Sequence, residues 1–235
     1  MKRFRYCLLM AFSALFICGF AQKDAAKPSF SPQRITFVTN VGKITVRLYN
    51  ETPMHRDNFL KQAQLGTFDS LLFHRVIKDF MIQSGDPTSK YALPGTFIGD
   101  ESPEPTVPAE FCYPRLYHKR GALAAARESD DVNPKQESST RQFYIVWGRT
   151  YPDEAQISRM DSVMFARSGK HIDASLREYY RKNPGTPFLD GSYTVFGEVT
   201  KGLKVVNRIQ SAPTDTNDRP LQDVRILRVI VKNNK

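Results

Sequence analysis

The sequence predicts a single, mainly β domain that carries a helical insertion. Short runs rich in β-branched and aromatic residues recur along the chain and are separated by turn residues. One stretch, residues 151–183, breaks this pattern with apolar residues at helical spacing. The 235 residues suffice for one substantial core, and no low-complexity linker divides them.

The first expected elements are a β-hairpin and a helix. Residues 35–39 and 43–49 are β-rich and flank the short turn at residues 40–42. Thr52 then supplies an N-cap and Pro53 a first-turn proline, which predicts a helix through about residue 64. Its inward face would hold Phe59, Leu60 and Ala63.

An arginine lies within the next β-rich segment, residues 72–83. Alternation places Arg75 on one face with Phe73 and Ile77, and places the residues Leu72, His74 and Val76 on the other. Desolvating an unpaired guanidinium costs several kcal/mol. Arg75 is therefore expected either to pair with a carboxylate or to point at a ligand, and the local pattern leaves both open. His74 is expected to be a hydrogen-bonded core histidine.

The remaining elements follow from similar patterns. Residues 87–117 contain six prolines and predict a long ordered loop, whose acids, Asp100, Glu101, Glu104 and Glu110, match no cation-binding spacing and are expected in solvent. Further strands are expected at residues 122–125, 142–146, 194–199 and 224–231, and a last helix at 203–209. In the insertion, Ile157, Met160 and Met164 indicate one helix, and residues 174–182 a second. The insertion either shapes a binding groove or only decorates the fold.

The N-terminus predicts export. A charged start precedes an apolar run, residues 6–20, that is short for a membrane span, so residues 1–21 are interpreted as a signal peptide. A flexible tether at 22–33 and a domain at 34–235 would follow. Soluble export, with a periplasmic location, is favoured. The alternatives are a lipoprotein acylated at Cys18 and an uncleaved anchor.

Composition and motifs exclude several functions. With Cys7 and Cys18 in the leader, Cys112 remains alone, so no internal disulfide is expected. The formal net charge is +10, but no run of five basic residues and no aromatic-basic stripe occurs, which argues against nucleic-acid binding. The other histidines, His55, His118 and His171, show no metal-ligand spacing. We expect neither a metal nor an organic cofactor.

The segment FHRVIKDFMIQSGD, residues 73–86, resembles the signature of the cyclophilins, a family of peptidyl-prolyl cis/trans isomerases. The similarity extends through residues 41–53, 121–127, 141–146 and 188–199. It implies an eight-stranded antiparallel β-barrel capped by two helices, here the segments 53–64 and 203–209. The helical insertion at about 151–183 is longer than the connection that most cyclophilins have there.

The resemblance also implies a site. Arg75, Phe80 and Gln83 match the catalytic residues, with Arg75 donating to the prolyl nitrogen and Gln83 bonding the substrate backbone. The substrate-binding positions are Met81, Ala126, Arg127, Gln142, Tyr144, Phe188, Leu189 and Tyr193. Tyr144 replaces the usual Phe and is expected to add a hydroxyl at the pocket rim. Phe188 replaces a Trp that many eukaryotic members carry.

The implied function is isomerisation of Xaa-Pro bonds in folding exported proteins, by a non-covalent mechanism. The alternative is a cyclophilin-like module that binds proline segments without significant turnover. Partners would be proline-containing polypeptides rather than nucleic acid, and we expect a monomer. The sequence leaves open the client proteins and the residue preferred before proline.

Overall fold

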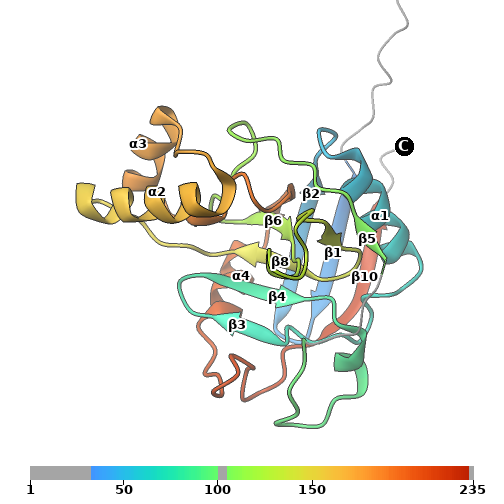
Figure 1. Cartoon of the computed structure of the whole chain (residues 1–235). Coiled ribbons are helices and arrows are strands. Elements are labelled where there is room, and N and C mark those ends of the chain that lie inside the picture. Colours follow the sequence, from blue (N-terminus) through green and yellow to red (C-terminus); the bar gives the residue numbers. More distant parts are fainter. Residues whose placement is uncertain (1–32, 100–104, 233–235) are drawn as a thin grey trace, which may run out of the picture.

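The computed structural model describes residues 33–99 and 105–232 (Figure 1). The strands of this part are β1 (Arg34–Thr39), β2 (Gly42–Leu48), β3 (Arg75–Ile77), β4 (Met81–Ser84), β5 (Thr106–Val107), β6 (Ala122–Ala125), β7 (Ser138–Ser139), β8 (Phe143–Val146), β9 (Val195–Lys201) and β10 (Ile226–Lys232). The helices are α1 (Pro53–Gln64), α2 (Glu154–Ser168), α3 (Ala174–Lys182) and α4 (Leu203–Gln210), with short 3₁₀ helices η1 (Pro87–Tyr91) and η2 (Pro187–Leu189).

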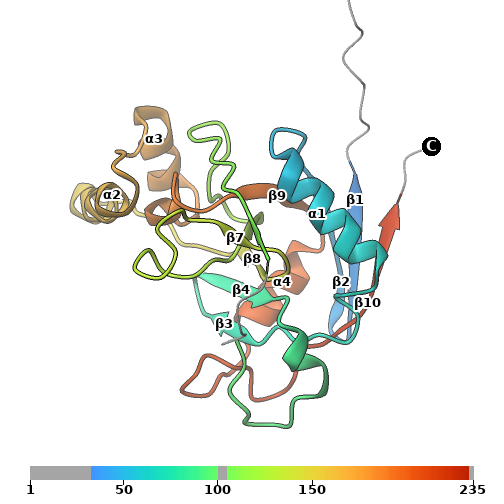
Figure 2. The same cartoon turned by 45° about the vertical axis from the view of Figure 1, so that its right-hand side comes forward.

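Eight strands form one antiparallel sheet in the order β10-β1-β2-β9-β6-β8-β4-β3. The sheet is strongly curled, as Figures 1 and 2 show. Its two edges are joined just before β3 and β10: Leu72 forms a β-bridge with Arg225, and the Phe73 amide donates to the Val224 carbonyl at 2.8 Å. Joining the edges leaves fewer unpaired backbone groups. The expected eight-stranded antiparallel fold is confirmed.

Both faces of the sheet are covered, which explains why every residue of β8 is buried. Phe143 and Ile145 point into the main core inside the curl, and Phe143 stacks on Phe37 with ring centroids 5.3 Å apart. Tyr144 and Val146 point the other way, into a second cluster on the outer face. The candidate site lies on this outer face.

One prediction about β3 is wrong. Alternation over residues 72–77 put Phe73 and Val76 on opposite faces, but both lie in the main core. Strand β3 begins only at Arg75, so the two-residue period does not extend back to Phe73. From Arg75 onward the period holds, and Ile77 packs against the outer cluster.

The two expected capping helices are present. Helix α1 packs against β9 and β10, and α4 packs against β2, β3 and β4. Thr52 occupies the N-cap position of α1, but its hydroxyl makes no capping hydrogen bond. The carboxylate of Glu110 takes that role, accepting from the Met54 amide at 3.1 Å and the His55 amide at 2.9 Å. The expectation that Glu110 belongs to a solvated acidic loop is therefore wrong, because its side chain is only 9% exposed.

The described part of the proline-rich segment 87–117 is mostly a loop, as expected, but it contains two short regular elements. It includes η1, whose N-cap Asp86 accepts from the Thr88 amide at 2.8 Å, and strand β5, which pairs with β7. Asp86 also accepts from the Gly99 amide at 2.7 Å and so anchors the far side of this excursion. The acids Asp100, Glu101 and Glu104 lie outside the described residues.

The helical insertion forms a body of its own beside the sheet (Figure 1). Helices α2 and α3 match the expected segment and enclose a small core that includes Ile157, Met164 and Tyr180, with Tyr113 and Tyr117 packed against it. Helix α2 also packs on η2, which carries Phe188. The insertion is thus joined to the wall of the candidate site.

The expected signal peptide, residues 1–21, and most of the tether lie outside the described residues, as does Cys18. In the part of the chain that the structure describes, no helix combines the length and the apolar character needed to cross a bilayer. Cys112 is a free thiol.

Candidate active site

A row of residues across four adjacent strands forms the base of the site. In the strand register, Arg75 of β3 lies opposite Gln83 of β4, Gln83 lies opposite Tyr144 of β8, and Tyr144 lies opposite Ala124 of β6. Residues directly opposite each other in an antiparallel sheet project from the same face. The fold therefore brings Arg75, Gln83 and Tyr144 together although up to 69 positions separate them.

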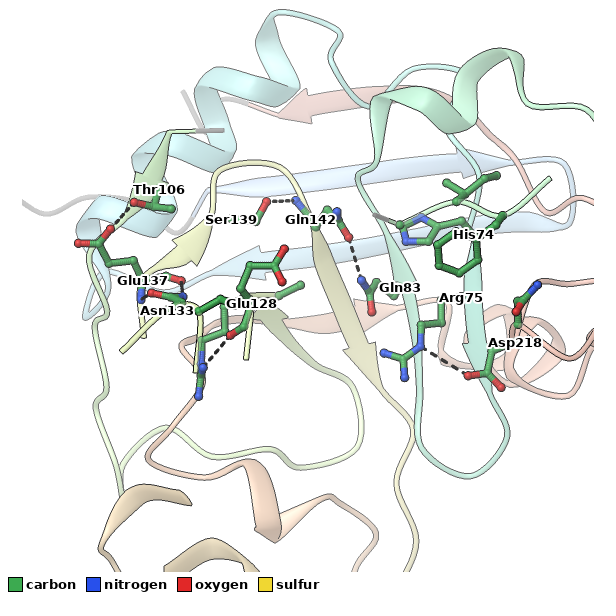
Figure 3. A pocket seen from close by; sticks show the side chains of 17 residues that line it. His74, Arg75, Gln83, Thr106, Glu128, Asn133, Glu137, Ser139, Gln142 and Asp218 are labelled. Atoms are coloured by element: carbon green, nitrogen blue, oxygen red, sulfur yellow. Dashed lines mark hydrogen bonds and ion pairs between the residues drawn. The ribbon is translucent and has the colours of Figure 1, made fainter. Parts of the chain in front are cut away.

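Two adjoining hollows lie over this row. The smaller one, called here the apolar pocket, has a volume of about 290 Å³ and is lined by every sequence-predicted site residue except Gln142. The larger one, called here the side groove, has a volume of about 710 Å³ and includes Gln142 (Figure 3). Arg75, Gln83, Ala126 and Arg127 line both hollows. All of the predicted site residues thus converge on one continuous depression, and their roles in binding and catalysis stay predictions.

Arg75 is oriented by a carboxylate from a distant loop. Its Nε lies 3.5 Å from Oδ2 of Asp218, and the two side chains are 46% and 42% exposed (Figure 3). The loop is held at β3, because the Val76 amide donates to the Asp218 carbonyl at 2.7 Å. No hydrogen bond to Nη1 or Nη2 of Arg75 is formed by the described residues, so these donors are available for a ligand. The pairing with a carboxylate is therefore confirmed, and a role of Arg75 toward a ligand stays a prediction.

Gln83 and Gln142 are held as a pair. Nε2 of Gln83 donates to Oε1 of Gln142 at 2.9 Å (Figure 3). Gly85 allows the close approach of the two segments: its φ is +112°, and a Cβ there would lie 2.2 Å from the Arg141 carbonyl oxygen. The pair presents one fixed set of amide groups where the apolar pocket meets the side groove.

Arg127 supports the wall and is itself held by several contacts. Its Nε donates to the Ser192 carbonyl at 2.9 Å, and its Nη1 lies 2.6 Å from a carboxylate oxygen of Asp130. The guanidinium carbon lies 4.4 Å from the ring centroid of Tyr193. The side chain is only 3% exposed, so Arg127 fixes Tyr193 in the wall of the apolar pocket.

The expected position of the Tyr144 hydroxyl is wrong. The hydroxyl points away from the pocket rim and lies 2.9 Å from Nε2 of the buried His118. Nδ1 of His118 lies 2.8 Å from Asp190, which also accepts from the Tyr180 hydroxyl at 2.7 Å. Burial raises the pKa of Tyr144 well above its usual value. This chain of groups links helix α3 of the insertion to the ring that forms the pocket floor.

His74 is buried, as expected, but the expectation that it is hydrogen-bonded is wrong. Neither ring nitrogen makes a hydrogen bond of good geometry with the described residues. Burial lowers the pKa of His74 to about 4, so the imidazole is neutral at pH 7. The ring forms part of the side groove beside Gly99. In the described part of the chain, no group of histidine, cysteine or acidic side chains is arranged to hold a metal.

Sequence reasoning missed three residues that bear on the site. Asp218 lies 143 positions after Arg75, and nothing in its polar surroundings points to a partner. For His118, the sequence shows only that metal-ligand spacing is absent, and it gives no sign of the contacts with Asp190 and Tyr144. Arg167 of helix α2 lines the apolar pocket, with its guanidinium carbon 5.9 Å from the ring centroid of Phe188. No local pattern distinguishes Arg167 from other exposed helical arginines, so only tertiary structure reveals it.

Comparisons with known proteins agree with this architecture. A family model described as cyclophilin type peptidyl-prolyl cis-trans isomerase/CLD matches residues 34–231. The chain is 29% identical over 208 residues to peptidyl-prolyl cis-trans isomerase CYP18-2 of Arabidopsis thaliana, covering 88% of this chain and 98% of that protein. It is 32% identical over 195 residues to peptidyl-prolyl cis-trans isomerase-like 1 of Neurospora crassa, covering 82% of this chain and 90% of that protein.

A solved structure shows the same fold. It is a cyclophilin-type peptidyl-prolyl cis-trans isomerase of Cryptosporidium parvum, crystallised in the presence of the dipeptide Ala-Pro. The TM-score is 0.59 at 23% identity, and the match covers 86% of this chain and all of that one. The family model matches residues 34–231, and the relatives and the eight-stranded fold agree with it. The chain therefore belongs to the cyclophilin-type peptidyl-prolyl cis-trans isomerases.

Proposed function

We propose that this protein isomerises Xaa-Pro bonds of exported polypeptides, with Arg75 acting on the prolyl nitrogen in the transition state. An amide loses its resonance when it twists, which produces a barrier of about 18–20 kcal/mol and uncatalysed times of tens to hundreds of seconds. No covalent bond has to be made or broken. Catalysis requires only that the protein bind the twisted amide more tightly than either planar form.

The observation that carries the proposal is a free donor pair beside an apolar pocket. The nitrogen of the twisted bond regains a lone pair and becomes a hydrogen-bond acceptor, whereas in the planar amide it is not. Nη1 and Nη2 of Arg75 have no partner among the described residues, and Asp218 restrains the side chain from Nε. A donor that is already oriented stabilises the twisted form without reorganisation.

The apolar pocket supplies a surface for the proline ring. Phe80, Met81, Leu189 and the ring of Tyr144 lie around it, and Phe80 packs against Phe188 with ring centroids 5.5 Å apart. An aliphatic ring against apolar and aromatic side chains is stabilised by burial. Gln83 and Gln142, at the adjoining end, present amide groups to the flanking backbone. The Ala-Pro dipeptide present with the Cryptosporidium protein supports the same class of ligand.

An isomerisation assay tests the proposal. The chain from Gln22 onward would be added to a tetrapeptide with a central Xaa-Pro bond, and exchange between cis and trans would be followed by NMR. We expect exchange to become faster at catalytic protein concentrations and a proline-limited protein to refold faster. Binding of the peptide without faster exchange would contradict the proposal and favour a binding module.

Export rests on the leader and needs its own test. Mass spectrometry of protein recovered from a bacterial periplasm should give an N-terminus at Gln22, the residue after the proposed cleavage site. A diacylglycerol-modified Cys18 would instead indicate a lipoprotein. An uncleaved chain retained in the cytoplasm would contradict export.

A further inference from the structure

The insertion places a cation at the mouth of the apolar pocket. Arg167 lies in the last turn of helix α2 and lines the pocket with Phe188 and Leu189. The end of α2 is held there by contact: a Cβ on Gly191 would lie 3.3 Å from Cδ of Lys170 and 3.5 Å from Cβ of Ser168. The loop that carries the pocket wall and the end of α2 are therefore in direct contact.

Arg167 differs from the other two arginines of the pocket. Arg75 has Asp218 as a partner, and Arg127 has Asp130. No carboxylate of the described residues forms an ion pair with Arg167. Its guanidinium carbon lies over the Phe188 ring, 5.9 Å from the ring centroid. An exposed guanidinium against an aromatic ring remains able to bind an anion in its own plane.

The surrounding charges are asymmetric. The apolar pocket is lined by three arginines and by no carboxylate among the described residues. The side groove, in contrast, includes Glu128, Glu137 and Asp218. Arg167 lines the apolar pocket and does not line the side groove. Its positive charge therefore lies beside the apolar pocket, where the proline ring would bind under the proposed function.

We infer that Arg167 is a specificity-determining residue that favours prolyl bonds with an acidic side chain on the residue next to proline. The inference rests on the proposed function, because it assumes that the proline ring occupies the apolar pocket. An Asp or Glu side chain beside that ring would lie within reach of the Arg167 guanidinium. The insertion would then act in substrate choice and would not be a mere decoration of the fold.

The expected effect is modest, because the pair would be partly exposed. Exposed ion pairs contribute about 0.2–1 kcal/mol, which corresponds to about a 1.4- to 5-fold preference. The preference should weaken as salt is raised from about 10 mM to 0.5 M, because the Debye length falls from about 30 Å to below 8 Å. A preference that came from shape alone would not respond to salt.

The test uses peptide pairs that differ only in charge. One pair carries Glu or Gln immediately before proline, and a second pair carries them immediately after it. The Glu/Gln ratio of kcat/KM would be measured for the unaltered chain and for Arg167→Gln, Arg167→Glu and Arg167→Lys. The matched control is Arg159→Gln, which removes the same charge from an exposed position on the same helix that does not line the pocket.

In at least one of the two positions, we expect Arg167→Gln to lower the ratio about 1.4- to 5-fold. Arg167→Glu should lower it further, Arg167→Lys should retain most of it, and Arg159→Gln should leave it unchanged. Equal ratios for Arg167→Gln and Arg159→Gln in both series would overturn the inference while leaving the proposed function intact. If no peptide is isomerised, the same ratios taken from dissociation constants decide the inference, and only the proposed function fails.

Discussion

Replacing Arg75 with alanine separates a catalytic role from a structural one. The ion pair with Asp218 joins two side chains that are about half exposed, at 3.5 Å. Such a pair contributes at most about 1 kcal/mol to stability. If instead Arg75 donates to the prolyl nitrogen only in the twisted state, its loss removes a charge-assisted hydrogen bond of about 1.5–3 kcal/mol from the transition state. That range corresponds to about a 13- to 160-fold loss of rate.

We therefore expect Arg75→Ala to lower kcat/KM by about 10²-fold, while the free energy of unfolding changes by less than about 1 kcal/mol. Affinity for the ground-state peptide should change little, because the contact forms chiefly in the transition state. Arg75→Lys should recover only part of the activity, since an ammonium lacks the fixed planar donors of the guanidinium. The control is Arg228→Ala, an exposed position on β10 away from the site.

Three measurements on each variant distinguish the catalytic role of Arg75 from a structural one. They are exchange of an Xaa-Pro peptide by NMR, peptide affinity by titration, and unfolding in denaturant. Full activity in Arg75→Ala would refute the proposed mechanism. A loss of affinity as large as the loss of kcat/KM would show that Arg75 binds planar and twisted forms equally.

Three further predictions concern the surrounding residues. Phe80→Ala should weaken peptide affinity as well as kcat/KM, because it removes an aromatic wall that packs on Phe188; unchanged affinity in titration would contradict this. Tyr144→Phe should cost about 1–3 kcal/mol in unfolding free energy, since it strands Nε2 of buried His118, whereas a pocket-rim hydroxyl would leave stability unchanged. His74 should titrate near pH 4 by NMR. The pKa of the same imidazole in the unfolded chain is about 6.5, so between pH 6.5 and 4 the unfolded state binds a proton that the folded state does not. The free energy of unfolding should therefore fall by about 3 kcal/mol as the pH drops from 6.5 to 4. A measured His74 pKa of 6 or above would refute this.

Much of the fold could be predicted from local patterns. The hairpin, helix α1, the helices of the insertion and helix α4 follow from periodicity and from punctuation by proline and glycine, which act over a few residues. The errors arise where a distant group takes over a local role. The hydroxyl of Thr52 was a reasonable cap, but Glu110 reaches the same amides from 56 positions away from Met54. Strands β5 and β7, of two residues each, are too short to produce a pattern.

The features of the site likewise divide into those that local sequence predicts and those that depend on distant segments. The signature residues Arg75, Phe80 and Gln83 could be identified through resemblance, because they lie close together in one segment. Tyr144 lines the apolar pocket, but the direction of its hydroxyl depends on His118, which approaches from a different loop. The burial of His74 could be predicted from its apolar neighbours. Its lack of a hydrogen-bond partner could not.

By itself, the sequence determined the family, the presence of a strand at residues 142–146 and the identity of the signature residues. These depend on residue type and on short-range spacing. Only the tertiary structure decided which carboxylate restrains Arg75, where the Tyr144 hydroxyl points and which end of the insertion contacts the apolar pocket. Each of these depends on segments far apart in the chain, whose approach is set by the curl of the whole sheet and the packing of α2 on η2. Arg167 is the clearest case, since its position beside Phe188 follows from helix packing and not from its neighbours in sequence.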